Sequence, residues 1–552
     1  MPKQRSSFGR LSWFVIVSCA ALILRFALHS VRRMDLVRSE TRADQATARF
    51  NATGRNVLVA ILDRGIDWAN EDFRNDDGTT RIEYIFDLTD DSGAKAPGNP
   101  YNAGTLYTMA QINAALRGGA PLKTRDAVGH GTASAGIACG NGRNLPDRKY
   151  RGIAPNAGII AVKLVSDGAP AHDGESEEQP YYDRKRIPIA IEFVRDKARQ
   201  LRRPCVMLLN IGSQGGPTDG TSDLCRKIDQ TVGPGKPGII FVSGPGDDGG
   251  LPNRAAGNVR QNETVDIEIE KGAEPALDFD LWYSGADRLD VTILTPRGTF
   301  GPYPSPRTND DATRNDESEF ELTHLGSNRD YYASTNGKRE LFIRLRGRPG
   351  RYVVRLKGAT APAGNFDATI NPSQLWRWSR SNRVLTHVAA GSIWDGATAR
   401  YNICPGDYVG RARWVDLDGV EHSMHEGDLG AIWDSSSTGP TFDGRLGVDV
   451  CAPGDVLFTT CNPRSYYATF RGNLIREGKG FYGKQSAVSA AAPIVVGIIA
   501  LMLERNPQLD APTVKTILQK TARRDGFTGP MQNPTWGYGK VDALAAVASS
   551  RR

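Results

Sequence analysis

The chain has 552 residues, of which 39% are hydrophobic and 24% are charged, and its formal net charge is +7. This length exceeds one compact core, so two or three folded units are expected. Lys and Arg are scattered, without the basic stripe that a nucleic-acid-binding protein needs. Seven cysteines, with no CxxC pair, are too few and too dispersed for a disulfide scaffold or a zinc site.

The first fifty residues contain a targeting pattern. Lys3, Arg5 and Arg10 precede an apolar run over residues 11–28, which Arg25 interrupts. This pattern is typical of a signal peptide or a short uncleaved anchor. We therefore expect residues 1–50 to be a signal or anchor segment with a linker. The protein is expected to be secreted, extracytoplasmic or membrane-anchored, with membrane association through residues 11–28; a cytoplasmic protein is the alternative.

Strand and helix patterns alternate from residue 51 onward. Continuous apolar runs predict buried parallel strands at residues 57–62, 159–162, 205–209 and 239–242. A helical pattern covers residues 187–201, and repeated strand–helix units predict an α/β fold with a parallel sheet covered by helices on both faces. In such sheets the chemistry lies at the carboxyl ends of the strands, where Asp63 falls.

The pattern changes near residue 258. From there to residue 372 apolar residues alternate with period two between turn residues, which predicts an all-β sandwich. A polar stretch at residues 308–319 is expected to be a long exposed loop. The α/β pattern then resumes, so we expect residues 51–257 and 373–552 to form one α/β domain that the insertion at 258–372 interrupts.

Three short blocks contain the residues of a nucleophilic site. They are Ile-Leu-Asp-Arg-Gly at 61–65, Gly-His-Gly-Thr at 129–132 and Ser-Ala-Ala-Ala-Pro at 489–493. The chain order Asp, His, Ser and these surroundings resemble the subtilisin-like serine proteases, the subtilases. Further segments extend the resemblance: Gly-Ile-Ala-Pro at 152–155, Ser-Ser-Ser-Thr-Gly-Pro at 435–440, Cys-Ala-Pro-Gly at 451–454 and Trp-Gly-Tyr-Gly-Lys-Val-Asp at 536–542.

The resemblance implies a fold and a set of roles. It implies a subtilisin-like α/β domain interrupted by a jelly-roll-like insertion, as in the clostridial spore-germination proteases. Asp63 would orient His130, His130 would act as general base and then acid, and Ser489 would attack the substrate carbonyl. The segment Asn210, Ile211 and Gly212 occupies the place of the substrate-binding strand. Substrates would be proteins or peptides, with no nucleic acid as partner.

No cofactor is required for this chemistry and no metal-binding residue is assigned. Structural calcium ions are common in the family, but the sequence does not identify ligands for one. His422 and His425 lie beside Glu426 in a polar, Gly-flanked hairpin, so surface histidines are the better interpretation. Cys451 and Cys461 either pair in an oxidising compartment or remain two buried thiols.

Residues 489–503 are apolar on all sides, which predicts a helix buried at the centre of a domain. A serine at its N-terminus lies near the positive end of the helix dipole and near free backbone N–H groups. These groups also help to hold an oxyanion. The position of Ser489 thus suits a nucleophile.

Several neighbours of the three residues depart from the family pattern. Arg64 replaces the usual Ser or Thr, Ala487 and Val488 replace Gly-Thr, and Asp247 replaces the asparagine of the oxyanion hole. An ionised carboxylate cannot donate a hydrogen bond, whereas a protonated one donates once. In subtilisin, loss of this donor lowers turnover about 10²–10³-fold. The resemblance implies a serine endopeptidase acting through an acyl-enzyme. The departures motivate the alternative, a weak or inactive pseudoprotease that binds peptides or protein partners.

Overall fold

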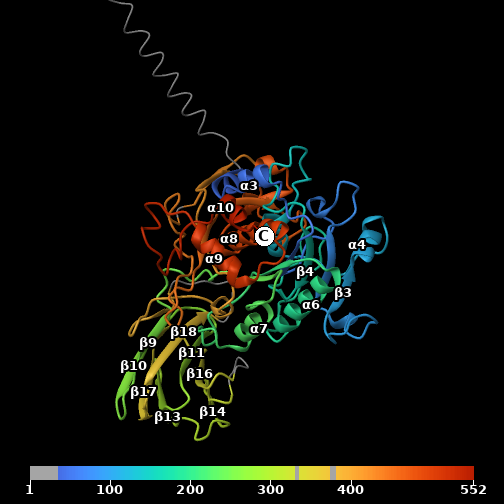
Figure 1. The fold of residues 1–552 in the computed structure, drawn as a ribbon. Helices are drawn as coiled ribbons and strands as arrows, with labels where there is room; N and C mark the ends of the chain where they lie inside the picture. The colour runs from blue at the N-terminus through green and yellow to red at the C-terminus, as the bar shows by residue number, and fades with distance from the viewer. Residues whose placement is uncertain (1–34, 330–334, 373–380, 425, 552) are drawn as a thin grey trace, which may run out of the picture.

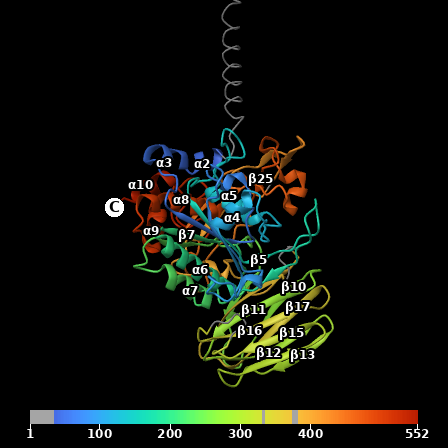
Figure 2. The ribbon, with the colours of Figure 1, turned by 90° about the vertical axis from the view of Figure 1, so that its right-hand side faces the viewer.

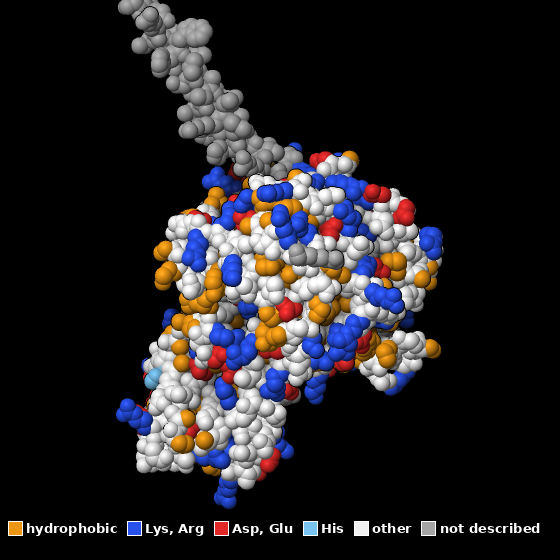
Figure 3. Space-filling model, viewed as in Figure 1, with side chains coloured by type: hydrophobic (Ala, Val, Ile, Leu, Met, Phe, Trp, Pro, Cys, Tyr) orange, Lys and Arg blue, Asp and Glu red, His pale blue; other side chains and the backbone are white. Residues whose placement is uncertain are grey.

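The computed structural model describes residues 35–329, 335–372, 381–424 and 426–551. A body of helices around a sheet carries a lobe of antiparallel strands at one end (Figures 1 and 2). On the face shown in Figure 3, Lys and Arg side chains are spread over both the body and the lobe.

The body is built on a six-stranded sheet with the order β3-β2-β4-β1-β7-β8. Its strands are β1 (Leu58–Asp63), β2 (Ile82–Asp87), β3 (Thr105–Thr108), β4 (Gly158–Lys163), β7 (Cys205–Leu209) and β8 (Ile239–Val242). β1 runs parallel to β4 and β7, and every residue of these three strands is buried. The four predicted apolar strands are confirmed, and β1 ends at Asp63.

Helices cover the sheet. They are α4 (Met109–Leu116), α5 (His130–Cys139), α6 (Arg186–Leu201), α7 (Asp223–Val232), α8 (Val488–Arg505), α9 (Ala511–Thr521) and α10 (Ala543–Ser549). α5 and α8 pack together against β1, and α6 and α7 pack together elsewhere on the sheet (Figure 2). The predicted α/β fold with a parallel sheet is confirmed.

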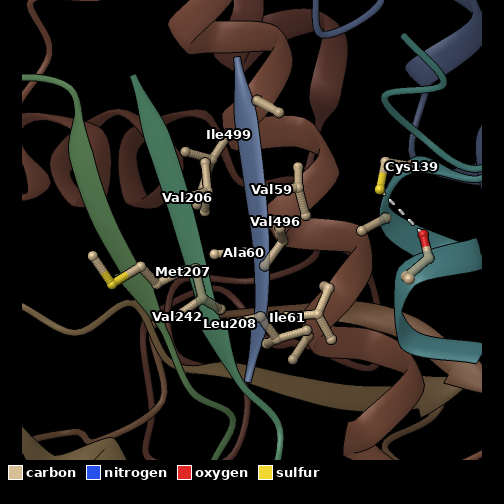
Figure 4. Packing of buried hydrophobic residues seen from close by; sticks show 14 of the residues in the cluster. Val59, Ala60, Ile61, Cys139, Val206, Met207, Leu208, Val242, Val496 and Ile499 are labelled. Atoms are coloured by element: carbon tan, nitrogen blue, oxygen red, sulfur yellow. Dashed lines mark hydrogen bonds between the residues drawn. The ribbon is translucent and has the colours of Figure 1, made fainter. Parts of the chain in front are cut away.

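α8 lies in the centre of the body, as its apolar composition predicts. Val496 and Ile499 of this helix lie among Val59, Ile61 and Val206 of the sheet (Figure 4). Among the described residues α8 is the one helix long and apolar enough to cross a membrane, yet it is largely buried within the protein. Burial of the apolar helix fixes its first turn, which includes Ser489, against the sheet.

The N-terminal part of the described chain corrects the expected linker. Residues 35–50 form α2 (Asp35–Glu40) and α3 (Ala43–Phe50), and α3 packs on α10. Arg38 is 2% exposed and donates through Nη1 to the carbonyl oxygens of Gly152 and Ile153 at 2.5 and 3.0 Å. These helices are short and largely polar, so their sequence does not show a core-facing stripe. The apolar segment 11–28 lies outside the described residues.

The lobe consists of two antiparallel sheets, which confirms the predicted β sandwich. One has the order β13-β12-β17-β10-β19 and the other β14-β15-β16-β11-β18-β9. The strands are β9 (Arg254–Asn258), β10 (Thr264–Lys271), β11 (Leu277–Ser284), β12 (Arg288–Thr295), β13 (Gly298–Tyr303), β14 (Ala312–Asp316), β15 (Phe320–Leu325), β16 (Lys338–Leu345), β17 (Gly350–Thr360), β18 (Asn365–Pro372) and β19 (Arg383–Val384). Alternate residues such as Ile267 and Ile269 of β10 enter a shared core.

Two expectations about the lobe are wrong in detail. The sheets extend beyond the predicted boundaries 258 and 372, because β9 begins before residue 258 and β19 follows residue 372. Neither strand shows the apolar alternation that marks a strand in a sequence. The polar stretch 308–319 is not all loop, because β14 within it pairs with β15. Its polar side chains suit an edge strand exposed to water.

Short strands complete the chain: β5 (Val165–Ser166), β6 (Tyr181–Tyr182), β20 (Pro405–Val409), β21 (Arg413–Val415), β22 (Glu421–Ser423), β23 (Val450–Asp455), β24 (Leu457–Thr460) and β25 (Tyr482–Gln485). Polar contacts join the lobe to the body: the Gly216 N–H donates to Asp280 Oδ2 at 2.8 Å, and Asn336 Nδ2 donates to Thr221 Oγ1 at 2.9 Å. Cys451 and Cys461 are buried free thiols, not a disulfide.

Candidate active site

Asp63 and His130 lie in direct contact at the carboxyl end of β1. His130 Nδ1 is 2.7 Å from Asp63 Oδ1; the histidine side chain is 18% exposed and the aspartate side chain 0%. Burial acts to raise the pKa of Asp63, but His130, Arg64 and Ser134 together hold it below its ordinary value. The carboxylate is therefore ionised at neutral pH and fixes the imidazole through Nδ1, leaving Nε2 for chemistry.

The start of α5 places His130. Gly129, directly before the helix, has φ 102°, which favours glycine. The buried carboxylate of Asp126 accepts from the Gly129 and Thr132 backbone N–H groups, each at 2.8 Å. A Cβ on Gly131 would overlap the carbonyl oxygen of Gly65, so the helix approaches the end of β1 closely. These small residues allow the imidazole to reach Asp63.

A path of hydrogen bonds joins Asp63 to the backbone of Ser489. Ser134 Oγ donates to Asp63 Oδ2 at 2.8 Å, and Asn210 Nδ2 lies within donating distance of Ser134 Oγ, at 2.9 Å. Asn210 Nδ2 also donates to the carbonyl oxygen of Ser489 at 2.9 Å. The amide of Asn210 therefore connects the α5 side of the site to the first turn of α8.

Ser489 is the second residue of α8 and is half-buried. It therefore belongs to the first turn, in which the leading backbone N–H groups have no carbonyl partner within the helix. Ala487 precedes the helix with φ 78° and ψ 175°, a conformation that is essentially restricted to glycine. The Gly-to-Ala departure seen in the sequence is therefore a strained backbone position beside the serine.

Arg64 lies beside the Asp63–His130 pair. Its Nη1 is 3.6 Å from Asp63 Oδ1 and 3.3 Å from His130 Nδ1, while its Nε pairs with Asp167. Burial acts to lower the pKa of the guanidinium, but the carboxylates of Asp167 and Asp63 raise it. Asp167 thus holds a permanent cation at the edge of the site.

Asp247 contacts the start of α8. Its Oδ1 accepts from the Val488 backbone N–H at 3.1 Å. Burial raises the pKa of Asp247 to about 6, although the Val488 N–H, His130 and Arg64 act to lower it. The carboxyl therefore changes its protonation state near neutral pH. The departure at this position introduces a titrating group beside the serine helix.

The match to a known family agrees with this geometry. The profile described as the Subtilase family matches residues 54–274 and 361–539, which is most of the chain. The chain belongs to the subtilase family. The gap in the match, residues 275–360, falls within the β lobe.

A solved structure shows the same fold over nearly the whole chain. The CspB protease of Clostridium perfringens superposes with a TM-score of 0.69 and 21% sequence identity, covering 93% of this chain and 97% of that one. At this identity the likeness establishes the subtilase fold with its additional strands, and it leaves the activity to be argued from the site.

Two characterised relatives match over short segments. The serine protease AprX of Bacillus subtilis (strain 168) is 37% identical over 112 residues, 20% of this chain and 24% of the relative. The calcium-dependent protease of Trichormus variabilis is 29% identical over 113 residues, 20% of this chain and 12% of the relative. The aligned region therefore spans about a quarter or less of these relatives.

The structure also places the predicted substrate-binding residues and His422. Ile211 is 8% exposed and, with Gly212, lines a cavity of about 270 Å³. His422 Nε2 is 2.7 Å from Asp416 Oδ2, and its ring stacks on Trp414. His425 lies outside the described residues. Across the part of the chain that the structure describes, no three His, Cys, Asp or Glu side chains group as metal ligands would.

Sequence reasoning missed several residues that shape the site. Asp126 precedes His130 by four residues, and an acidic residue just before a helix is a capping signal that could have identified it. Ser134 lies on the same face of α5 as His130, four residues on, which also could have been inferred. Asp167 had no local signal, because only the folded chain brings it to Arg64.

Proposed function

We propose that this subtilase is a serine endopeptidase that hydrolyses peptide bonds through an acyl-enzyme. The observation that supports it most directly is the 2.7 Å contact between Asp63 and His130 at the end of β1, joined through Ser134 and Asn210 to the Ser489 backbone. A buried carboxylate that holds Nδ1 of the histidine, at the carboxyl end of a central strand and next to a helix that begins with a serine, is the arrangement that a Ser-His-Asp triad requires.

The proposed reaction has two halves. Ser489 Oγ attacks the substrate carbonyl while His130 takes the hydroxyl proton; Asp63 stays ionised and stabilises the imidazolium. His130 then gives that proton to the leaving amine, and the acyl group remains on Ser489. Water, deprotonated by His130, hydrolyses the ester and restores the serine.

The oxyanion would be held at the start of α8. The Ser489 backbone N–H lies in the first turn and can donate, and protonated Asp247 supplies a second hydrogen bond. Because the pKa of Asp247 is about 6, this donor is present in acid and is lost as the pH rises. We therefore propose an endopeptidase whose oxyanion hole weakens towards alkaline pH.

Fluorophosphonate labelling of the folded protein tests the proposal. We expect a covalent adduct on Ser489, located by peptide mass spectrometry, and none in Ser489→Ala. Turnover of an unfolded protein substrate should disappear in the same variant. A folded wild-type protein that binds peptides but neither reacts with the fluorophosphonate nor cleaves the peptides would instead be a pseudoprotease. This is the rival function because Arg64, Asp247, Ala487 and Val488 depart from the family pattern.

Each step uses a side chain or a backbone N–H, so the proposed reaction requires no cofactor. Calcium, which the name of one relative invokes, would serve the fold rather than the bond-breaking step. Substrates are proposed to be proteins or peptides. We also propose that the protein acts outside the cytoplasm or at a membrane, on the basis of residues 11–28; fractionation of cells that express the full chain tests this.

A further inference from the structure

Trp394 stands between two backbone segments that lead to the proposed site. It follows the β lobe and directly precedes a short 3-10 helix, Asp395–Thr398. The Trp394 N–H donates to the carbonyl oxygen of Pro245 at 2.8 Å, and the Asp395 N–H donates to that of Ser213 at 3.1 Å. Residues 394–395 therefore tie the segment after Asn210 to the segment before Asp247.

The indole fills the space between these segments. A Cβ on Gly212 would lie 2.6 Å from Trp394 Cε3, and a Cβ on Gly246 would overlap the indole nitrogen. Gly212 comes two residues after Asn210, and Gly246 directly precedes Asp247. Both positions favour glycine because the indole packs against their backbones.

Asp248 fixes the orientation of the ring. Trp394 Nε1 donates to Asp248 Oδ2 at 2.6 Å. Asp248 is 1% exposed, and its Oδ1 has no hydrogen-bond partner among the described residues. Among the described residues, the indole N–H is therefore the one side-chain donor to this buried carboxyl. The ring is held by the hydrogen bond from its Nε1 and by its close contacts with Gly212 and Gly246.

A cavity of about 270 Å³ lies against Trp394. Its lining includes Trp394, Ile211, Gly212, Leu224 and Ile187. Ser489 and Asp247, both within the described chain, do not line it. A cavity of roughly 150 Å³ accepts benzene, so this one has room for an aromatic side chain. Trp394 therefore both lines this cavity and contacts Gly246, the residue next to Asp247.

We propose that Trp394 is a specificity-determining residue that restricts the substrate residue supplying the attacked carbonyl to a small side chain, Gly or Ala. This inference rests on the proposed endopeptidase function. A carbonyl attacked by Ser489, with its oxygen near Asp247, places the adjoining Cα beside the segments at Gly212 and Gly246. The side chain on that Cα meets the indole, so a large side chain has no space.

Peptide substrates that differ only at this residue test the proposal. We expect the wild-type protein to favour Ala over Phe in kcat/KM. Trp394→Gly should open the cavity to the substrate side chain and raise the Phe-to-Ala ratio by about 10- to 100-fold, the range that one pocket contact supplies. Trp394→Phe is the matched control: it keeps an aromatic wall but lacks the N–H that binds Asp248, and it should keep the preference for Ala.

The outcomes separate the two proposals. Fluorophosphonate labelling of Ser489 with an unchanged Phe-to-Ala ratio in Trp394→Gly overturns the role of Trp394 alone. Absence of labelling overturns the endopeptidase function. The role of Trp394 is then tested by peptide binding: in the Ser489→Ala background, Trp394→Gly should shift the Kd for the Phe peptide relative to that for the Ala peptide in the same direction. If Trp394→Gly does not unfold cooperatively, Trp394→Ala is used in its place. A wild-type protein that prefers Phe over Ala also contradicts the inference.

Discussion

The Val488 backbone N–H donates to Asp247 Oδ1 at 3.1 Å, which ties the first residue of α8 to the carboxyl proposed for the oxyanion hole. Ser489 is the next residue of the helix, so the protonation state of Asp247 acts directly beside the nucleophile. Burial raises the pKa of Asp247 to about 6, so its charge changes within the pH range in which proteases are assayed.

Asp247→Asn should raise activity most at neutral and alkaline pH. Asn donates at every pH and can still accept from Val488, whereas Asp247 ionises above about pH 6 and then repels the oxyanion. We expect kcat/KM at pH 8 to rise by up to about 10²-fold and to change little at pH 5. The measurement is the pH–rate profile of both proteins; coincident profiles would remove Asp247 from the oxyanion hole.

Ala487→Gly should stabilise the fold. Ala487 has φ 78° and ψ 175°, and such backbone strain in a residue with a Cβ costs about 1–3 kcal/mol. Glycine removes the strain, so the urea midpoint should rise by an amount equivalent to about 1 kcal/mol or more. Ala500→Gly, in the interior of α8, is the control and should lower the midpoint. A lower midpoint in Ala487→Gly would show that the backbone is not strained there.

Asp248→Asn should flatten the dependence of stability on pH. Burial raises the pKa of Asp248 to about 8 in the folded protein, whereas an unfolded aspartate titrates near 4. The folded state thus holds a proton that the unfolded state releases, so this group's contribution to stability is complete below about pH 4 and is lost as the pH rises through 8.

The difference between Asp248→Asn and wild type isolates this contribution. Asn stays neutral and its oxygen can accept from Trp394 Nε1, so the variant should gain up to about 1.4 kcal/mol relative to wild type for each pH unit in that window. Urea unfolding at pH 4, 6 and 8 measures it. Parallel stability curves for the two proteins would show that Asp248 is not held neutral by burial.

The sequence predicted those parts of the molecule whose signals are local. Asp63 follows an apolar strand, and His130 and Ser489 stand at helix starts with small neighbours, so their placement could be anticipated. Trp394 could not, because it lies 182 positions beyond Gly212 in the numbering and follows the whole β lobe. The helices at residues 35–50 were missed because their few buried alanines and the buried Arg38 do not form an apolar pattern.

Asp167→Asn should lower activity, and adding Arg64→Ser should restore it. Asp167 holds the Arg64 guanidinium, whose Nη1 is already 3.6 Å from Asp63 Oδ1. Without Asp167 the cation should pair more fully with Asp63, displace His130 from Oδ1 and oppose the charge that forms on the imidazole, which we expect to cost kcat about tenfold or more. Arg64→Ser removes that competitor. The measurement compares kcat and urea midpoint among wild type, Asp167→Asn, Arg64→Ser and the double variant. If Asp167→Asn keeps the kcat of wild type and only its midpoint is lowered, Arg64 and Asp167 serve stability alone.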